Sequence, residues 1–401
     1  MRSRGSARKA MCEPMLLNAL AFIPLVAWIY LLIGRGMFWL CAEHDDRAAP
    51  SAMPDVWPSV AIVVPARDEA DVIARSIGAL TAQDYPGRVR IVLVDDQSSD
   101  GTAVAARAAA DAAGAGDRLQ VLNGRPLPSG WTGKLWALSQ GIEEASRGTP
   151  PDYLLLTDAD IGHDGGNLRR LIARAEAGGL TLASLMVRLH CRTWPERLMI
   201  PAFVFFFQML FPFGWVNDPR SRVSAGAGGC MLVRRKALEA AGGIASVRAE
   251  IIDDCALAGR LKQQGPIWLG LTTNAESLRP YTTLGEIGRM ISRSAYAQLG
   301  YSPWLLIGTV LGMALIYLAP SAIALFGHGP AQLAALGAWL VMAIAFQPML
   351  RLYRCSPLWG LALPLIGALY TAFTVQSALE VWRGRGGMWK GRAQAIAGGP
   401  A

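Results

Sequence analysis

The segment Tyr153-Leu154-Leu155-Leu156-Thr157-Asp158-Ala159-Asp160 is the centre from which the predicted fold extends in both directions. Three leucines after Tyr153 are typical of a short strand buried on both faces of a parallel sheet. The strand stops at Asp158 and Asp160, two carboxylates that packing does not explain. Open α/β sheets bind ligands at the carboxyl ends of their strands, and hard divalent cations prefer oxygen ligands. Taken alone, however, the pair favours a solvated polar turn, because short motifs often match by chance.

The composition indicates a protein associated with a membrane. Of 401 residues, 52% are hydrophobic and 17% charged, and the mean hydropathy is +0.30, which is too apolar for an ordinary soluble enzyme. The net charge of +8 lacks the basic runs with interleaved aromatic residues of nucleic-acid-binding proteins, so we attribute it to a membrane surface. Six scattered cysteines without a Cys-x-x-Cys pair, and four histidines, argue against a zinc site or a disulfide framework. No obligate protein partner is indicated.

Apolar segments flank a more polar body. A basic tail at 1–14 is followed by an uncharged run, and we expect residues 15–40 to form a transmembrane anchor because the run can span a bilayer. A cleaved signal peptide is the competing interpretation, which the length of the run and the lack of a clear cleavage site disfavour. A proline-containing linker follows at 41–58. Residues 304–381 predict a C-terminal membrane region of two to three helices, and a basic tail occupies 382–401.

The body at 59–303 alternates between strand and helix patterns. Apolar runs at 60–65, 90–96, 119–122, 153–157 and 180–187 predict strands, and helices are predicted at 68–80, 102–113, 135–145 and 167–177. This alternation is typical of an α/β layer with mainly parallel strands. Right-handed crossovers bring the carboxyl ends of such strands to one edge. Asp95, Asp96, Asp158 and Asp160 are therefore expected to lie in one crevice.

The hydrophobic segment 198–217 interrupts the body. It contains no charge, but Pro201 and Pro212 argue against a plain spanning helix. We expect an interfacial or re-entrant segment that shields an apolar acceptor, with a buried core helix as the alternative. Farther along, Asp253 and Asp254 precede a predicted helix. One aspartate suffices to cap a helix, so the adjacent pair indicates a further role.

In their order along the chain, these motifs resemble those of family 2 glycosyltransferases with the GT-A fold. The matching segments are Pro65-Ala66-Arg67-Asp68-Glu69, Val94-Asp95-Asp96-Gln97-Ser98-Ser99-Asp100, Gly133-Lys134-Leu135-Trp136-Ala137-Leu138, Asp158-Ala159-Asp160 and Asp253-Asp254-Cys255-Ala256-Leu257. The layout of anchor, body, C-terminal apolar segments and a Trp389-Lys390-Gly391-Arg392 tail is similar to the hopanoid (hopene)-associated glycosyltransferases, and more distantly to ceramide glucosyltransferases.

The resemblance implies an inverting enzyme that moves a sugar from a nucleotide-sugar donor, expected to be a UDP-sugar, to a hydroxyl of a lipid. It implies an Mg²⁺ or Mn²⁺ ion on Asp158 and Asp160, and Asp254 as general base beside Asp253. The expected donor-binding residues are Pro65, Arg67, Glu69, Asp95, Asp96, Lys134, Asp158 and Asp160. Arg293 is expected to stabilise the leaving group. The expected location is a bacterial-type inner (plasma) membrane, crossed more than once, with the catalytic body in the cytoplasm.

The sequence departs from the family pattern at one motif, and two alternative functions remain open. Many processive members carry Gln-x-x-Arg-Trp, but here residues 289–296 read Arg-Met-Ile-Ser-Arg-Ser-Ala-Tyr, which favours a single transfer. A polyprenyl phosphate acceptor, or an inactive membrane scaffold of the same fold, are the alternative functions. His163 is either an additional metal ligand or, the favoured interpretation, a solvated loop histidine.

Overall fold

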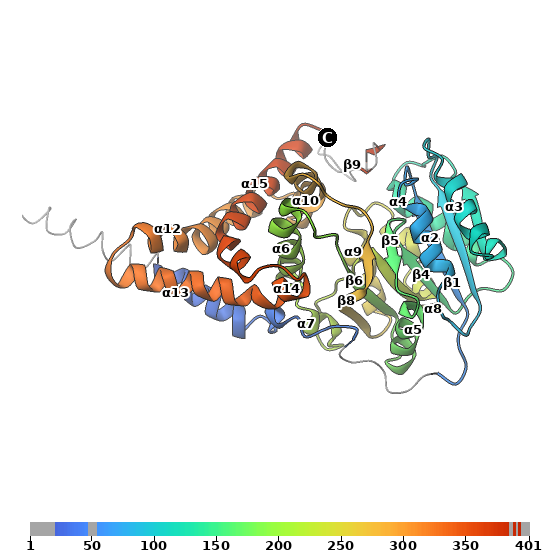
Figure 1. Ribbon diagram of the computed structural model, residues 1–401, viewed down its shortest axis with the longest axis horizontal. Helices are drawn as coiled ribbons and strands as arrows, with labels where there is room; N and C mark the ends of the chain where they lie inside the picture. Colours follow the sequence, from blue (N-terminus) through green and yellow to red (C-terminus); the bar gives the residue numbers. More distant parts are fainter. Residues whose placement is uncertain (1–20, 47–53, 385–387, 390–391, 394–401) are drawn as a thin grey trace, which may run out of the picture. The chain divides into compact units, whose positions relative to one another are not determined.

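The computed structural model describes residues 21–46, 54–384, 388–389 and 392–393 (Figure 1). It contains two compact units. The described part of the apolar unit runs to Cys41 and includes Cys191–Pro212 and Tyr281–Trp382. The α/β unit comprises the described residues from Ala42 to His190, Phe213–Pro280 and those after Trp382. The basic tail expected at 1–14, the first residues of the expected anchor and most of the tail expected at 382–401 lie outside the described residues.

The α/β unit contains an eight-stranded sheet within the described residues, with the order β3-β2-β1-β4-β7-β6-β8-β5. The strands are β1 (Val60–Ala66), β2 (Val89–Asp95), β3 (Leu119–Asn123), β4 (Tyr153–Thr157), β5 (Ile161–His163), β6 (Leu182–Arg188), β7 (Cys230–Arg234) and β8 (Ile267–Ser277). β1 is parallel to β2 and β4, β2 to β3, and β6 to β8. β7 is antiparallel to β4 and β6, and β5 to β8. The expected mainly parallel α/β sheet is confirmed.

Helices cover the sheet on both faces. They are α2 (Ile73–Thr81), α3 (Thr102–Ala112), α4 (Gly133–Ala145), α5 (Asn167–Ala177), α7 (Phe213–Asn217), α8 (Arg235–Ala240) and α9 (Asp253–Lys262), with short 3-10 turns η2 (Gly116–Arg118) and η3 (Ile244–Val247). Figure 1 shows α2 and α3 beside β1. α5 has the bounds that its apolar spacing predicts. α2 begins at Ile73 and not at Asp68, because the residues before it hydrogen-bond to the loop after β2.

Successive side chains of β1 point to opposite faces of the sheet, and apolar residues pack against it on both faces. Ile62 and Val64 belong to a buried cluster with Ile77 of α2 and other apolar residues of α3 and α5. Val63 points to the opposite face, toward α4. A Cβ on Gly141 of α4 would lie 2.4 Å from Val63 Cγ1, so glycine is needed for α4 to approach the sheet this closely. Fully buried aliphatic side chains of this kind contribute about 1.5–3 kcal/mol each.

The apolar unit is helical. Besides the short apolar helix Ala21–Ile33 it contains η1 (Phe38–Leu40), α6 (Trp194–Leu210), α10 (Leu284–Gln298), α11 (Pro303–Met313), η4 (Ala314–Leu318, a π-helical turn), α12 (Ala319–Phe326), α13 (Gly329–Ala345), α14 (Gln347–Leu352), η5 (Pro357–Ala362) and α15 (Leu363–Trp382). Within the described part of the chain, three continuous helical stretches are long and apolar enough to cross a membrane: Pro303–Phe326, Gly329–Leu352 and Pro357–Trp382. At the C-terminal end, β9 (Met388–Trp389) and β10 (Arg392–Ala393) form an antiparallel pair.

The segment expected to be interfacial, 198–217, is divided between the units. Its first part belongs to α6 of the apolar unit and its last part forms α7 of the α/β unit. α6 is largely buried, and the ring of Phe205 packs against Phe38 and Phe346 at centroid distances of 5.2 and 5.1 Å. These contacts favour the alternative interpretation, a buried helix. The body expected to run to residue 303 also divides, because the segment Phe213–Pro280 of the α/β unit stops before α10, which belongs to the apolar unit.

Candidate active site

Asp158, the first of the two carboxylates that follow β4, faces a lysine. Lys134 lies in the first turn of α4, whose N-cap Thr132 accepts a hydrogen bond from the backbone N–H of Leu135. Its Nζ is 2.7 Å from Oδ1 of Asp158 and 3.9 Å from Oδ2 of Asp253. Burial by itself lowers the pKa of Lys134, but Asp158 and Asp253 outweigh it and keep the pKa above its usual range. The lysine is therefore a fixed positive charge between two acidic segments that lie far apart in the sequence.

Asp254 occupies the same pocket, at the start of α9. Its Oδ2 accepts a hydrogen bond from Gly228 N at 3.0 Å, and its Oδ1 accepts one from Cys255 N at 2.8 Å. The N-cap position of α9 belongs to Ile252. Burial and the charge of Asp253 raise the pKa of Asp254 to about 6, against the lowering effect of Lys134. A carboxylate with this pKa is mostly ionised at neutral pH and is a good proton acceptor.

The loop before β7 is shaped around this carboxylate. A Cβ on Gly228 would lie 3.1 Å from Nζ of Lys134 and 3.5 Å from Oδ2 of Asp254. Glycine therefore allows the backbone N–H to reach the carboxylate while the lysine stays in place. The pocket contains Pro65, Lys134 and Asp158 of the predicted donor residues together with Asp253 and Asp254, whereas Arg67, Glu69, Asp95, Asp96 and Asp160 are not part of its lining. Its lining consists of Pro65, Lys134, Leu135, Leu138, Leu156, Thr157, Asp158, Gly228, Met231, Ile244, Asp253, Asp254 and Leu257.

Asp160, the second carboxylate after β4, pairs with Arg279. Nε of Arg279 donates to Oδ2 of Asp160 at 3.4 Å, and its Nη2 pairs with Oε2 of Glu69. Burial and the neighbouring Asp158 raise the pKa of Asp160, and Arg279 opposes this shift. The sequence interpretation missed Arg279 because it did not assign β8. The apolar run at 267–271 was the available signal for this strand, but it ends eight residues before Arg279.

The remaining predicted donor residues lie in two interlocked loops, after β1 and after β2. Asp68 N donates to Oγ of Ser98, and Ser98 N donates to Oδ1 of Asp95 at 3.0 Å. Nη1 of Arg67 donates to the carbonyl oxygen of Asp96 and lies 3.9 Å from its Oδ2. Asp68 has a φ of 49°, which its hydrogen bonds to the second loop hold in place. The loops thus form one rigid wall that carries Arg67, Asp95 and Asp96.

Comparison with known proteins gives a family for this domain. Residues 61–242 match the model of Glycosyl transferase family 2. The chain carries a glycosyl transferase family 2 domain. It is therefore an enzyme of the glycosyltransferase class, and the match includes β4 and the Asp158–Asp160 pair, while Asp254 and Arg279 lie beyond it. No curated protein sequence matches the chain.

Solved structures of similar fold include the mannosyltransferase PcManGT from Pyrobaculum calidifontis in complex with GDP-Man and Mn²⁺. It shares 19% sequence identity, the match covers 90% of this chain and 99% of that one, and the TM-score is 0.56. Glucosyl-3-phosphoglycerate synthase from Mycobacterium tuberculosis also shares 19% identity, with 61% of this chain and 79% of that chain covered and a TM-score of 0.38. The first likeness confirms the expected GT-A-like α/β fold.

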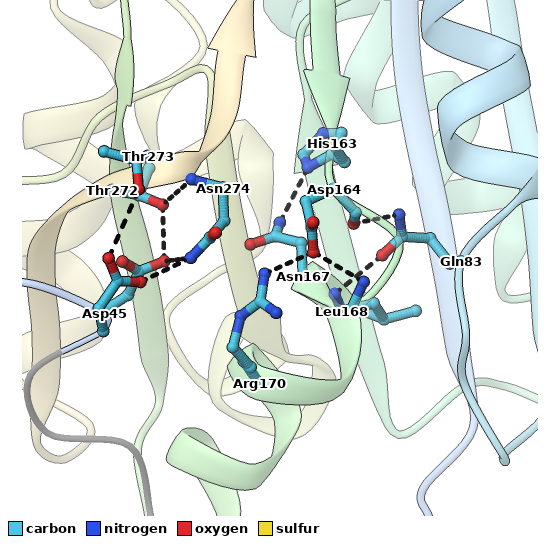
Figure 2. A network of polar contacts seen from close by, with 12 residues as sticks. Asp45, Gln83, His163, Asp164, Asn167, Leu168, Arg170, Thr272, Thr273 and Asn274 are labelled. Atoms are coloured by element: carbon cyan, nitrogen blue, oxygen red, sulfur yellow. Dashed lines mark hydrogen bonds and ion pairs between the residues drawn. The ribbon is translucent and has the colours of Figure 1, made fainter.

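His163 of the glycosyltransferase domain is neither a solvated loop residue nor a free ligand. It is buried in β5, its Nε2 lies 2.9 Å from Oγ1 of Thr157 and its Nδ1 2.9 Å from Nδ2 of Asn167. Figure 2 shows His163 above Asn167 with this contact dashed. Burial lowers the pKa of His163 to about 4, so the ring is neutral at pH 7. The expectation of a solvated histidine was wrong, and both ring nitrogens already have partners.

Arg293 is not among the residues that the pocket gathers. It lies on α10 in the apolar unit and its side chain is exposed, whereas the other predicted site residues belong to the α/β unit. A role at the leaving group therefore stays a prediction from the family resemblance. Arg279, of the α/β unit itself, supplies the arginine that contacts the acidic pair.

Asp158 and Asp160 fit a divalent cation. Both donors are carboxylate oxygens at the carboxyl end of a buried strand, which suits Mg²⁺ or Mn²⁺. Their mutual repulsion contributes to the raised pKa of Asp160, and a basic side chain stands against each of them. The two carboxylates therefore attract positive charge. Lys134 and Arg279 each pair with one of them, whereas a divalent cation could bind both.

Proposed function

We propose that the protein transfers a sugar from a nucleoside diphosphate donor to a hydroxyl group of a lipid, in a single displacement that inverts the anomeric centre. The observation that carries this proposal is the position of Asp254 and Asp158 in one pocket, with Lys134 between the acidic segments. The pocket thus holds a base for the acceptor beside groups for the donor phosphates. No second carboxylate is needed as a nucleophile when one base activates the acceptor.

On the donor side, the rigid wall with Arg67, Asp95 and Asp96 would bind the base and ribose by hydrogen bonds, and Pro65 and Glu69 would line the same region. Lys134 and Arg279 would place positive charge near the diphosphate. A divalent cation on Asp158 and Asp160 would neutralise the charge that develops on the leaving diphosphate. The similar mannosyltransferase was solved with GDP-Man and Mn²⁺, which supports this class of donor and metal. A UDP-sugar remains the donor that the sequence resemblance favours.

On the acceptor side, Asp254 would remove the proton of the attacking hydroxyl. Its pKa of about 6 lets it be ionised at pH 7 while it keeps useful basicity. This favours a hydroxyl acceptor over a polyprenyl phosphate, because a phosphate is already anionic at neutral pH and needs no base. A buried carboxylate with a raised pKa that lines a pocket is typical of a functional site, which favours an enzyme over an inactive scaffold.

The lipid nature of the acceptor is supported by the three helical stretches of membrane-spanning length. They would hold the enzyme at a bacterial inner membrane, with the α/β unit in the cytoplasm where nucleotide sugars are made. The similarity of layout to hopanoid-associated glycosyltransferases makes a hydroxylated hopanoid the first acceptor to test.

The test is transfer by the full-length protein in detergent with added lipid. UDP- and GDP-sugars are supplied with Mn²⁺, and products are identified by mass spectrometry. We expect Asp160→Ala and Asp254→Asn each to lower turnover at least about 100-fold, because one removes a metal ligand and the other the base. Wild-type turnover no higher than that of both variants would reject the enzymatic role. Equal transfer to a polyprenyl phosphate by wild type and Asp254→Asn would assign the acceptor to the phosphate class.

A further inference from the structure

His163 is a buried residue of the α/β unit to which the proposed mechanism gives no role. It is the last residue of β5, and Thr157 is the last residue of β4. The turn with Asp158 and Asp160 lies between them in the sequence. Nε2 of His163 lies 2.9 Å from Oγ1 of Thr157, so a side-chain hydrogen bond closes the segment 157–163 at its base.

The partners of Thr157 determine the direction of this hydrogen bond. Its Oγ1 donates its one hydrogen to the carbonyl oxygen of Gly229 at 2.8 Å. The hydroxyl can therefore only accept from His163, and Nε2 carries the hydrogen of the neutral ring. Nδ1 is left as an acceptor, and Nδ2 of Asn167 donates to it at 2.9 Å (Figure 2). We call these three side chains, from Asn167 through His163 to Thr157, the His163 network.

The network ends on the loop that holds the predicted base. Gly229 follows Gly228, whose backbone N–H donates to Oδ2 of Asp254 at 3.0 Å. A Cβ on Gly229 would lie 3.0 Å from Cγ2 of Val187, so this loop packs closely against β6. The hydroxyl of Thr157 thus joins the residue before the predicted metal ligands to the loop beside the base.

Packing alone does not explain a polar network at this place. The neighbours Ile161, Leu168 and Ala275 belong to the buried apolar cluster of the sheet. Oδ1 of Asn167 is buried and has no hydrogen-bond partner among the described residues, which is unfavourable. Apolar side chains of similar size would fill the space without leaving an acceptor unpaired. The network therefore has a purpose other than stability.

We propose that His163 is a positioning residue for both halves of the active site. Through Thr157 it fixes the turn with Asp158 and Asp160, and through Gly229 it fixes that turn against the loop that holds the base. Metal-binding carboxylates depend on such surrounding hydrogen bonds for their orientation. The ring itself contacts neither metal nor substrate. This inference rests on the proposed function, because it concerns the same site.

Four variants of the full-length protein test this role. Thr157→Val keeps the size of the side chain but removes the hydroxyl, and His163→Leu removes both ring nitrogens. His163→Gln is the conservative variant, because its amide can donate to Thr157 and accept from Asn167. Thr81→Val is the matched control, since Thr81 is a buried threonine of α2 whose Oγ1 donates to the carbonyl oxygen of Gly78 at 3.0 Å, outside the network. Circular dichroism verifies folding, and Thr157→Val keeps the test decisive if His163→Leu does not fold.

The first measurement is Mn²⁺ binding, which does not require turnover. Mn²⁺ alone is titrated into each protein, the free ion is followed by electron paramagnetic resonance, and only the binding that Asp160→Ala abolishes is counted. We expect Thr157→Val and His163→Leu each to weaken this binding at least about tenfold, as the loss of outer-shell partners does. His163→Gln and Thr81→Val should stay within about threefold of the wild type, because both keep the network intact.

The second measurement is kcat for sugar transfer at saturating Mn²⁺. In Thr157→Val and His163→Leu it should stay at least about tenfold below the wild-type value, because the loop beside the base loses its anchor. Recovery of the wild-type kcat at saturating Mn²⁺ would overturn the link to the base.

The results also separate this inference from the proposed function. The positioning role is overturned if Thr157→Val and His163→Leu bind Mn²⁺ like the wild type, if Thr81→Val weakens binding equally, or if His163→Gln binds no better than His163→Leu. A wild type without Mn²⁺ binding that depends on Asp160 would overturn it as well. The expected binding pattern in a protein that transfers no sugar would reject the proposed function and uphold the positioning of the turn. Unchanged Mn²⁺ binding in active variants would reject only the positioning.

Discussion

The assignment of Asp254 as the base predicts a specific pH dependence. Its pKa is raised to about 6, and a general base acts only when ionised. Activity is therefore present above pH 6 and is lost as the pH falls through this value. Below the pKa, kcat/KM should fall about tenfold per pH unit. Asp254→Asn should remove the dependence together with most of the activity.

Lys134 provides the perturbation that tests the cause of this pKa. It is the cation that lowers the pKa of Asp254, so Lys134→Gln should raise it. A charge within hydrogen-bonding or near-contact distance shifts a carboxylate pKa by about 1–3 units, and the partly open pocket places the expected shift near one unit. Half-maximal kcat/KM should then move from about pH 6 to about pH 7. One unit corresponds to about 1.4 kcal/mol.

The assay is kcat/KM for donor at saturating acceptor between pH 5 and 9, with Mn²⁺ held constant. Lys134→Gln will also lower the plateau because the lysine faces the donor, so the position of the acidic limb is the informative quantity and not its height. Lys134→Arg keeps the charge and is the control, with a limb near pH 6. An acidic limb that stays near pH 6 in Lys134→Gln, or that persists in Asp254→Asn, would refute the assignment of Asp254 as the titrating base.

Three further predictions follow from the structure. Arg279 lies 3.4 Å from Asp160 and competes with Mn²⁺ for this carboxylate, so Arg279→Gln should strengthen Mn²⁺ binding. Because such ion pairs contribute about 0.2–1 kcal/mol, the Mn²⁺ concentration at half-maximal activity should fall by up to about fivefold. A rise in that concentration would contradict the competition. If Arg293 stabilises the leaving group, Arg293→Ala lowers kcat at least about tenfold while Arg289→Ala, exposed on the same helix, does not; equal effects would remove Arg293 from the mechanism. Leu155→Ala, in the buried centre of β4, should lower the free energy of unfolding by about 2–5 kcal/mol in urea titrations, and a loss below 1 kcal/mol would contradict its burial.

Local patterns were sufficient for the elements whose burial is regular. β4 and α5 have the bounds that their apolar spacing predicts, because a buried strand and an amphipathic helix both show their environment in neighbouring residues. The start of α2 was less predictable. Asp68 and the residues after it have helical spacing, but hydrogen bonds to Ser98 and Thr102 keep them in a loop, and those partners lie about thirty residues away.

For the site, the sequence alone identified the carboxylate pairs that we propose for function and the order in which they occur: Asp95–Asp96, Asp158–Asp160 and Asp253–Asp254 each follow or precede a recognisable element. Only the tertiary structure decided which cations neutralise them. Arg279 reaches Asp160 because β8 pairs in parallel with β6 and ends beside β5, and His163 is buried for the same reason. Contacts between residues more than a hundred positions apart depend on strand order, and a local pattern of side chains does not contain that information.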